Sequence, residues 1–282
     1  MLPPLRRAVL LLTAATAGIA GPPVADVSGQ EGDSPQGMVL VPAGEFTMGR
    51  AFETADDKTG MRPLILRDDR PAHAVRLAAY WMDATEVTHV AYREFVEATG
   101  HRAPYHWPDG NCPRRLADYP IYNVDWGDAS AYCRWQGKRL PTEAEWERAA
   151  RGGEEGGRYP WGDGKPDSEK ARFSTQLGPG PVGQYPANGF GLRDMAGGQA
   201  EWCQDWFDRT YYADSPEKNP AGPPEGLYKI VRGGAWSDGP NRVTVHFRNW
   251  VRPTQRTPNL GFRCVRDASH PSGGGKAREA AN

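Results

Sequence analysis

The sequence predicts an α+β domain with much irregular structure. Its 282 residues include 34 Gly and 26 Pro, which interrupt nearly every segment, so continuous periodic stretches are short. Ten Trp residues supply the aromatic anchors that hold long loops in place. With 38% hydrophobic residues, the chain is long enough to bury one large core or two small ones.

Charge and hydropathy exclude several classes of partner. A formal net charge of -1 and a pI near 6.6 give no broad basic field for nucleic acid and no polybasic membrane patch. A mean hydropathy of -0.69 excludes a protein with many membrane spans. We therefore expect no nucleic-acid partner, and no membrane span once the N-terminal segment has been removed.

Residues 1–20 have the layout of a secretory signal peptide. Arg6 and Arg7 form a positive region, residues 8–17 are apolar but too few to span a bilayer, and residues 18–20 form a small-residue cleavage site. A retained anchor is the alternative, and the arginine pair leaves the twin-arginine route open. The layout predicts a periplasmic or secreted protein.

Polar segments flank the folded part of the chain. Residues 21–37 are rich in Pro and Gly, and residues 268–282 are similar. Because neither segment has large apolar residues to bury, we predict a disordered linker and a disordered tail. The folded domain is therefore expected over residues 38–267.

The first part of this domain predicts short strands. Residues 38–42 and 44–49 are rich in β-forming residues and are separated by Pro, Ala and Gly, which predicts a hairpin. Residues 50–69 are charged and aperiodic, which predicts a loop. Residues 74–77 and 80–82 predict one or two further strands.

Three helices follow, and each has a capping residue. Thr88 and Asp125 can cap helices that run to Thr99 and Gln136, directly before glycines. Thr142 and Glu145 form a capping box that opens a third helix, over residues 143–151. Only loops and short strands are expected after this helix.

The four cysteines are expected to form disulfides. Export would place them in an oxidising compartment, and they show no Cys/His spacing typical of zinc sites. Cys112, Cys133, Cys203 and Cys264 allow three pairings, and their spacing does not choose among them.

Nine short motifs, taken together and in order, resemble the formylglycine-generating enzyme (sulfatase-modifying factor) family. They are MVLVPAGEFTMG (38–49), EVT (86–88), residues 126–135, GKRLPTEAEWE (137–147), YPWG (159–162), NGFGL (188–192), EW (201–202), RGGAW (232–236) and NLGFRC (259–264). The resemblance covers nearly all of residues 38–266. It implies a single C-type-lectin-like domain, low in regular structure, with a surface cleft.

The resemblance also implies a disulfide between Cys133 and Cys264. Such a bond would close a very long loop and would stabilise the domain by about 4–5 kcal/mol in the chain-entropy model. It would leave Cys112 and Cys203 available for a second bridge, with buried free thiols as the alternative.

The copper chemistry of the family is not expected here. Its copper-dependent members oxidise a substrate cysteine to formylglycine with two cysteines in the last part of the domain, because cuprous ions prefer thiolate ligands. No cysteine lies between Cys203 and Cys264 in this chain, and Ala235 replaces the serine that follows the paired glycines. We therefore predict that the chain binds no copper and is not an oxidase of that type.

Two other branches of the family carry out different chemistry and can be compared with this chain. The sulfoxide synthases of ergothioneine and ovothiol biosynthesis add a helical domain that helps to hold a histidine-bound iron, and this chain has no HxxxH pair. A third branch is exported, has a single domain and acts in maturation of the pyoverdine chromophore. The signal peptide, the length and the missing copper cysteines of this chain resemble this third branch most.

Residues 194–201, DMAGGQAE, resemble a calcium-binding loop of the family. The resemblance assigns carboxylate ligands to Asp194 and Glu201 and carbonyl ligands to Met195, Gly197 and Gln199, and Ca²⁺ prefers such hard oxygen donors. The alternative is that the two carboxylates only cap the loop. The second calcium loop of the family has no counterpart, because an arginine replaces an expected ligand.

The segment from 232 to 264 supplies the catalytic candidates, which are Trp236, Asp238, His246, Arg248 and Asn259. Asp238 falls near a missing thiol, and an aspartate that fixes the tautomer of His246 would form an acid–base pair. The alternative places Asp238 in a turn and His246 in a strand.

Several arginines and tryptophans of the chain are predicted to have structural roles. Arg232, Arg248 and Arg263 are expected to hold core carbonyls and carboxylates. The expected core anchors are Trp146, Trp161, Trp202 and Trp206.

The sequence thus predicts an exported protein that catalyses or assists a copper-independent oxidative modification. The expected substrate is a peptide or a peptide-derived metabolite, such as a siderophore chromophore. A non-catalytic, lectin-like binding module is the alternative. A formylglycine-generating oxidase with unusual ligands ranks third.

Overall fold

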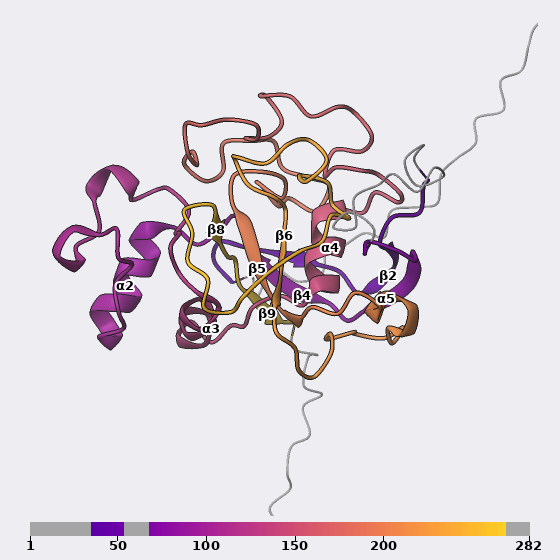
Figure 1. Cartoon of the computed structure of the whole chain (residues 1–282), viewed down its shortest axis with the longest axis horizontal. Coiled ribbons are helices and arrows are strands. Elements are labelled where there is room, and N and C mark those ends of the chain that lie inside the picture. The colour runs from indigo at the N-terminus through magenta and orange to yellow at the C-terminus, as the bar shows by residue number, and fades with distance from the viewer. Residues whose placement is uncertain (1–34, 54–67, 269–282) are drawn as a thin grey trace, which may run out of the picture. The chain divides into compact units, whose positions relative to one another are not determined.

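The computed structural model describes residues 35–53 and 68–268 (Figure 1). The predicted signal peptide lies outside the described residues, as do most of the linker over 21–37 and all of the tail after residue 268. Most of the loop predicted over 50–69 also lies outside them.

The hairpin predicted for the first two strands is wrong. β1 (Met38–Val41) pairs antiparallel with β4 (Tyr80–Asp83), whose other edge pairs with β9 (Val265–Asp267). β2 (Gly44–Met48) pairs instead with β3 (His73–Leu77). Between β1 and β2, the carbonyl of Pro42 accepts a hydrogen bond from Arg148 rather than from a strand. The chain therefore changes sheets at this point.

A four-stranded sheet in the order β7-β6-β5-β8 brings the predicted site segments together (Figure 1). Its strands are β5 (Ala200–Trp206), β6 (Lys229–Arg232), β7 (Asn249–Val251) and β8 (Leu260–Gly261). β5 pairs antiparallel with β6 and parallel with β8. The calcium-like loop thus leads into the same sheet as the segment that carries the catalytic candidates.

All three predicted helices are present, and each begins directly after its predicted N-cap residue. α2 (His89–Thr99), α3 (Trp126–Trp135) and α4 (Glu143–Arg151) each begin after a side chain that accepts a hydrogen bond from a backbone N–H three residues later. α2 and α4 end at Gly100 and Gly152, where φ is 69° and 61°, a left-handed conformation that glycine adopts without strain.

Three short helical turns among the described residues were not predicted, and the last of them shows that the expectation of only loops and short strands after the third helix is wrong. They are η2 (Pro108–Gly110), η3 (Arg114–Leu116) and α5 (Tyr211–Asp214). Figure 1 shows α4 beside β5 and β6, with α2 and α3 toward β8. α4 also contacts β2 and β3, so it joins the first part of the domain to the four-stranded sheet.

The core confirms two of the four expected tryptophan anchors. Trp146 and Trp202 are wholly buried, whereas Trp161 and Trp206 are half-buried and lie nearer the surface. The two large core clusters contain one of the buried pair each. The aromatic residues therefore hold both the sheets and the outer loops, as the composition predicts.

The disulfide between Cys133 and Cys264 is present and joins residues 131 apart in the sequence. The second bridge is wrong, because Cys112 and Cys203 are free. Cys203 is buried in the core cluster of β1 and α4, whereas Cys112 packs against the other cluster, which holds the disulfide. The two free thiols therefore belong to different parts of the core.

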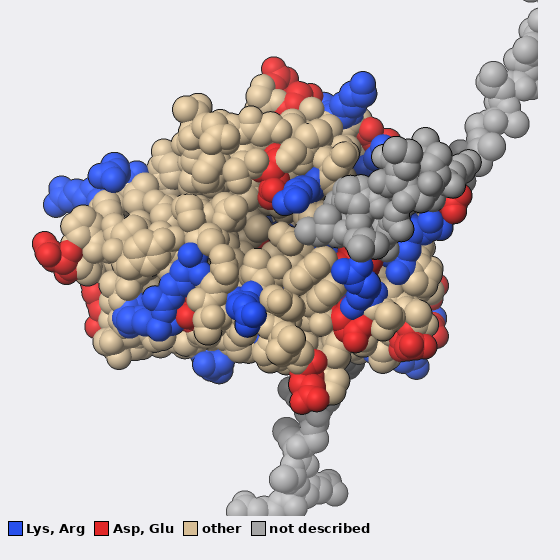
Figure 2. Space-filling view, in the orientation of Figure 1, with Lys and Arg blue, Asp and Glu red and all other residues tan. Residues whose placement is uncertain are grey.

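No helix within residues 35–53 and 68–268 is both long and apolar enough to cross a bilayer. On the face drawn in Figure 2, acidic and basic side chains are interspersed among broad uncharged areas. That face shows no continuous basic surface of the kind that binds nucleic acid.

Candidate functional site

α4 turns two carboxylates into the core. Glu143 and Glu147 lie four residues apart, so they project from the same face of the helix, and both side chains are buried. Buried carboxylates are tolerated only when hydrogen bonds and cations compensate for the lost water. Their partners therefore decide what this part of the molecule can do.

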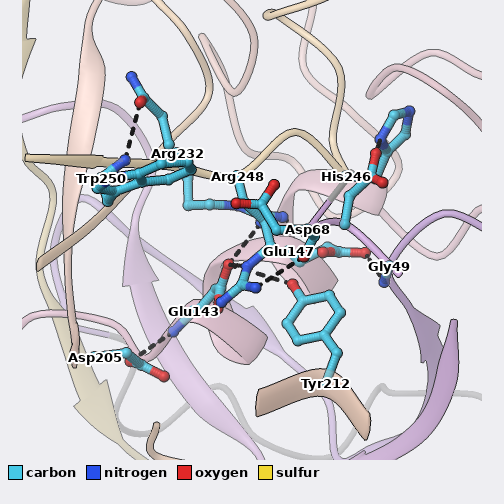
Figure 3. Close-up of polar contacts among 12 residues, drawn as sticks. Gly49, Asp68, Glu143, Glu147, Asp205, Tyr212, Arg232, His246, Arg248 and Trp250 are labelled. Carbon is cyan, nitrogen blue, oxygen red and sulfur yellow. Dashed lines mark hydrogen bonds and ion pairs between the residues drawn. The ribbon is translucent and has the colours of Figure 1, made fainter. Parts of the chain in front are cut away.

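Arg232 and Arg248 supply the compensating charge. Arg248 donates from Nε and Nη2 to the two oxygens of Glu143, over 2.7 and 3.0 Å, while Tyr212 donates its hydroxyl to the same carboxylate (Figure 3). Arg232 bridges the two acids, with Nη1 2.9 Å from Glu143 and Nη2 2.6 Å from Glu147. The RGG motif and the segment after it are thereby fixed to α4.

Glu147 and Arg248 are both held in their charged forms. Burial opposes ionisation of Glu147, but the charges of Arg151 and Arg232 outweigh burial and lower its pKa to about 2. The pKa of Arg248 lies above its ordinary value despite burial, because Glu143 stabilises the cation. A group that does not exchange protons near neutral pH is a poor acid or base. The contacts of Arg248 with Glu143 agree with the structural role that the sequence also predicts, and the catalytic role of Arg248 stays a prediction.

Two further buried acids lie beside the network. Burial, reinforced by the charge of Glu143, raises the pKa of Asp205 to about 8, and its Oδ2 accepts the backbone N–H of Glu143 over 2.8 Å. Burial also raises the pKa of Asp68 to about 6, although Arg248 opposes the shift. Both carboxyl groups can therefore change protonation between pH 5 and 9.

His246 forms a histidine–aspartate pair, but with Asp69 rather than Asp238. Its Nδ1 lies 3.0 Å from Oδ2 of Asp69, and Nε of Arg50 donates to the same oxygen over 3.0 Å. Burial lowers the pKa of His246 even though Asp69 favours the cation, so the imidazole is neutral. With Nδ1–H donating to the carboxylate, Nε2 carries the lone pair, and it is buried without a hydrogen-bond partner among the described residues. This atom can accept a proton.

Asp238 belongs to a turn, as the alternative interpretation predicted, but His246 lies in a turn between β6 and β7 and not in the strand that the same interpretation gave it. Its Oδ2 accepts the backbone N–H of Ala235 over 2.9 Å, and its Oδ1 lies 3.3 Å from Nη1 of Arg242. The carbonyl of Asp238 accepts the N–H of Ser174 over 2.9 Å. These contacts hold the loop after the paired glycines, so the predicted Asp238–His246 pair is wrong.

Trp236 and Asn259 lie together at the edge of β5 and β8. Trp236 donates Nε1–H to the carbonyl of Pro258 over 3.4 Å, and its backbone N–H binds Gly198. The carbonyl of Asn259 accepts the N–H of Ala200. Both side chains are half-buried, so they line the surface where the two site segments meet.

The calcium-like loop has one available carboxylate oxygen. Asp194 adopts a left-handed φ of 59°, and its Oδ2 accepts the N–H of Gly183. Its Oδ1 is buried and has no hydrogen-bond partner in the part of the chain that the structure describes. Burial raises the pKa of Asp194, which is the effect expected of an uncompensated acid. Asp194 therefore fits a cation ligand.

Glu201 fits the calcium loop less well. Arg263 donates from Nε and Nη2 to both of its oxygens over 2.8 Å, and Trp146 donates Nε1–H to Oε2 over 2.8 Å. A cation would have to share this carboxylate with Arg263. Met195 is buried, and Gln199 holds the carbonyl of Pro258 through Nε2 while its Oε1 lacks a partner.

Glu86 is the acidic residue of this region that the sequence analysis missed. It is wholly buried, and burial together with the charge of Asp194 raises its pKa well above the ordinary value. Glu86 and Asp194 line the same small cavity. Nothing in the motif EVT indicated this pairing, because 108 residues separate the two acids and only the fold joins them. Within the described residues, no group of three or more His, Cys, Asp or Glu is arranged to hold a metal.

Comparison with known proteins identifies the family. The sequence profile described as "Sulfatase-modifying factor enzyme 1-like domain" matches residues 23–268. The formylglycine-generating enzyme of Streptomyces coelicolor is 37% identical over 297 residues, covering 85% of this chain and 92% of that protein. Hercynine oxygenase of Mycolicibacterium smegmatis is 32% identical, and the match covers 81% of this chain and 61% of that protein.

A solved structure agrees with these relatives. PvdO from Pseudomonas aeruginosa superposes with a TM-score of 0.69 at 29% identity, over 82% of this chain and 94% of that one. The fold is accordingly the C-type-lectin-like one that the motifs imply. Taken together, the matched profile, the relatives and the shared fold show that this chain belongs to the sulfatase-modifying factor (formylglycine-generating enzyme) family.

Proposed function

We propose that this chain catalyses or assists a copper-independent oxidative modification of a peptide or of a peptide-derived metabolite, such as a siderophore chromophore. The observation that carries the proposal is the absence of any cysteine between Cys203 and Cys264. Where the copper-dependent relatives keep two thiols, this chain has a turn closed by Asp238 and a neutral His246.

His246 is the group that we assign to proton transfer. Asp69 orients the imidazole through Nδ1, which leaves Nε2 to accept a proton from a bound substrate. Trp236 and Asn259 are assigned to the surface that receives the substrate, because both are half-buried beside β8. These assignments require His246→Gln to lower the rate of modification and Asn259→Ala to weaken substrate binding.

The copper assignment is tested on the purified mature protein. We expect no stoichiometric binding of Cu(I), and no aldehyde when the protein is incubated with a cysteine-containing sulfatase peptide. The measurements are a competitive Cu(I) titration and mass spectrometry of the peptide. Stoichiometric binding together with aldehyde formation would establish a formylglycine-generating oxidase and would refute the proposal.

A non-catalytic binding module is the second candidate, favoured by the burial of His246, of which only 4% is exposed. Mass spectrometry of candidate peptides and siderophore precursors distinguishes the two. A mass change that His246→Gln reduces supports an enzyme. Binding without any mass change supports the module.

We also propose that the protein is exported and holds a structural calcium ion. The ligands would be the carboxylates of Asp194 and Glu201 with the carbonyls of Met195, Gly197 and Gln199, and the unpartnered oxygen of Asp194 supports this set. Calcium should raise the melting temperature of the wild type, and Asp194→Ala should abolish that rise. Asp167→Ala, at an exposed aspartate, is the matched control. A melting temperature of the wild type that calcium leaves unchanged would refute the calcium site.

A further inference from the structure

Arg148 differs from the other buried arginines in the described part of the chain. Each of the others lies within 3.0 Å of a carboxylate oxygen. These are Arg50, Arg151, Arg232, Arg248 and Arg263. Arg148 is only 7% exposed, yet it forms no ion pair with any described residue. A buried guanidinium without an anion is costly, because it has lost its water without gaining a counter-charge.

Most donors of Arg148 are unused. Its Nη2 donates to the carbonyl of Pro42 over 2.7 Å, whereas Nε and Nη1 have no acceptor. Burial lowers the pKa of the guanidinium, and the nearby charge of Glu155 only partly offsets this effect. An arginine retains its charge even so, and its planar fork matches a carboxylate. The side chain therefore has the charge and the donors to hold an anion, and because Nε and Nη1 are buried, an anion reaches them only when the guanidinium turns toward the pocket.

The backbone makes room for this guanidinium at Gly44. A Cβ on Gly44 would lie 2.7 Å from Nη2 and 3.1 Å from Nη1 of Arg148. Gly44 does not adopt a left-handed conformation, so its backbone does not itself require glycine. The absence of a side chain at this position serves the close approach of Arg148.

A pocket of about 230 Å³ lies beside Arg148. Its apolar walls come from Pro42, Phe46 and Phe190. Glu154 and Glu155 line it as well; both are exposed, and neither forms an ion pair within the described residues. Glu45 and Arg151 also line the pocket, and each already has an ion-pair partner, Arg76 and Glu147 respectively. The pocket thus combines a cationic wall, an apolar interior and an acidic rim.

We infer that this pocket, lined by Pro42, Phe46, Arg148, Phe190 and the two glutamates, binds the free carboxylate of a basic amino-acid residue at the end of a peptide. The carboxylate pairs with Arg148, the aliphatic stem packs on the phenylalanines, and the side-chain cation pairs with the rim. A dianion such as phosphate would meet the same acidic rim and is disfavoured. This inference does not rest on the proposed oxidative function.

The test uses four probes in calorimetric titrations with the mature protein. They are acetyl-Gly-Lys with a free carboxylate, its C-terminal amide, acetyl-Gly-Leu and free lysine. The amide should bind at least about tenfold more weakly than the acid, because a charge-assisted hydrogen bond is lost. The leucine peptide should also bind more weakly. Free lysine that binds as tightly as the peptide would identify the amino acid, rather than a peptide end, as the source of the carboxylate.

Arg148→Met separates binding from folding. This change removes an uncompensated buried cation, so the melting temperature should stay constant or rise, while binding of acetyl-Gly-Lys is lost. The matched control is Arg114→Met, at an exposed arginine on η3. If the Arg148 variant does not fold, the double variant Glu154→Gln and Glu155→Gln provides a second test. It should weaken the binding of the lysine peptide more than the binding of the leucine peptide. Equal binding of acid and amide, unchanged binding by Arg148→Met, or no binding of the acid overturns the inference.

Discussion

Substitution of Glu147 tests whether the buried ion network stabilises the fold. Glu147 accepts hydrogen bonds from Arg151 over 2.6 Å, from Arg232 over 2.6 Å and from the backbone N–H of Gly49 over 2.8 Å. Lowering the pKa from its ordinary value of 4.5 to about 2 corresponds to about 3 kcal/mol of stability at neutral pH. Removing one partner of a buried ion pair typically costs about 3–5 kcal/mol, which agrees.

Glu147→Gln keeps the shape of the side chain and removes its charge. For a domain of this size, a loss of about 3 kcal/mol should lower the melting temperature by about 6–12 °C at pH 7. The assay is thermal unfolding followed by circular dichroism. Glu94→Gln, at an exposed position on α2, is the matched control and should have the same melting temperature as the wild type.

The pH dependence gives a second measurement of the same effect. Because the pKa of Glu147 is lowered by folding, its contribution is complete above pH 4.5 and is lost as the pH falls toward 2. The difference in melting temperature between wild type and Glu147→Gln should therefore shrink over this window. If Glu147→Gln has the same melting temperature as the wild type at pH 7, the network does not stabilise the fold and this assignment is refuted.

Two further predictions concern stability. Replacing Cys133 and Cys264 by alanine should cost about 4–5 kcal/mol in a thermal or urea unfolding assay, because the bond closes a loop of more than a hundred residues, whereas Cys112→Ala should have little effect. Asp205 has a pKa raised by folding to about 8, so its burial should cost stability increasingly as the pH rises from 4 to 8. Asp205→Asn should remove that dependence, and a wild type whose melting temperature stays flat from pH 4 to 8 would contradict this account.

The helices could be predicted because their signals are local. Thr88, Asp125 and Thr142 each lie within three residues of the N–H groups that they cap. Strand pairing is not local in this way. β1 and β2 adjoin in the sequence, but β1 pairs with β4 and β2 with β3. The motif order identified the fold without deciding these pairings.

The candidate site shows the same division. The sequence supplied His246 and suggested an aspartate partner, but the acid that pairs with it, Asp69, lies 177 residues earlier, in a segment with no periodic pattern. The sequence predicted a structural role for Arg248, because arginines in the core of such a loop-rich fold hold carbonyls and carboxylates. Only its two contacts with Glu143 show that it is fixed in an ion network rather than available to a substrate.

The sequence alone indicated the family, the capped helices and the absence of any cysteine between Cys203 and Cys264. Through the family resemblance, it also indicated that Cys264 pairs with Cys133. The tertiary structure decided which acids and bases meet: His246 with Asp69, Glu143 with Arg248, and Asp194 with Glu86. The physical reason is that capping depends on atoms a few residues apart. Charge compensation in a core depends on burial and on distances between side chains that are far apart in the chain.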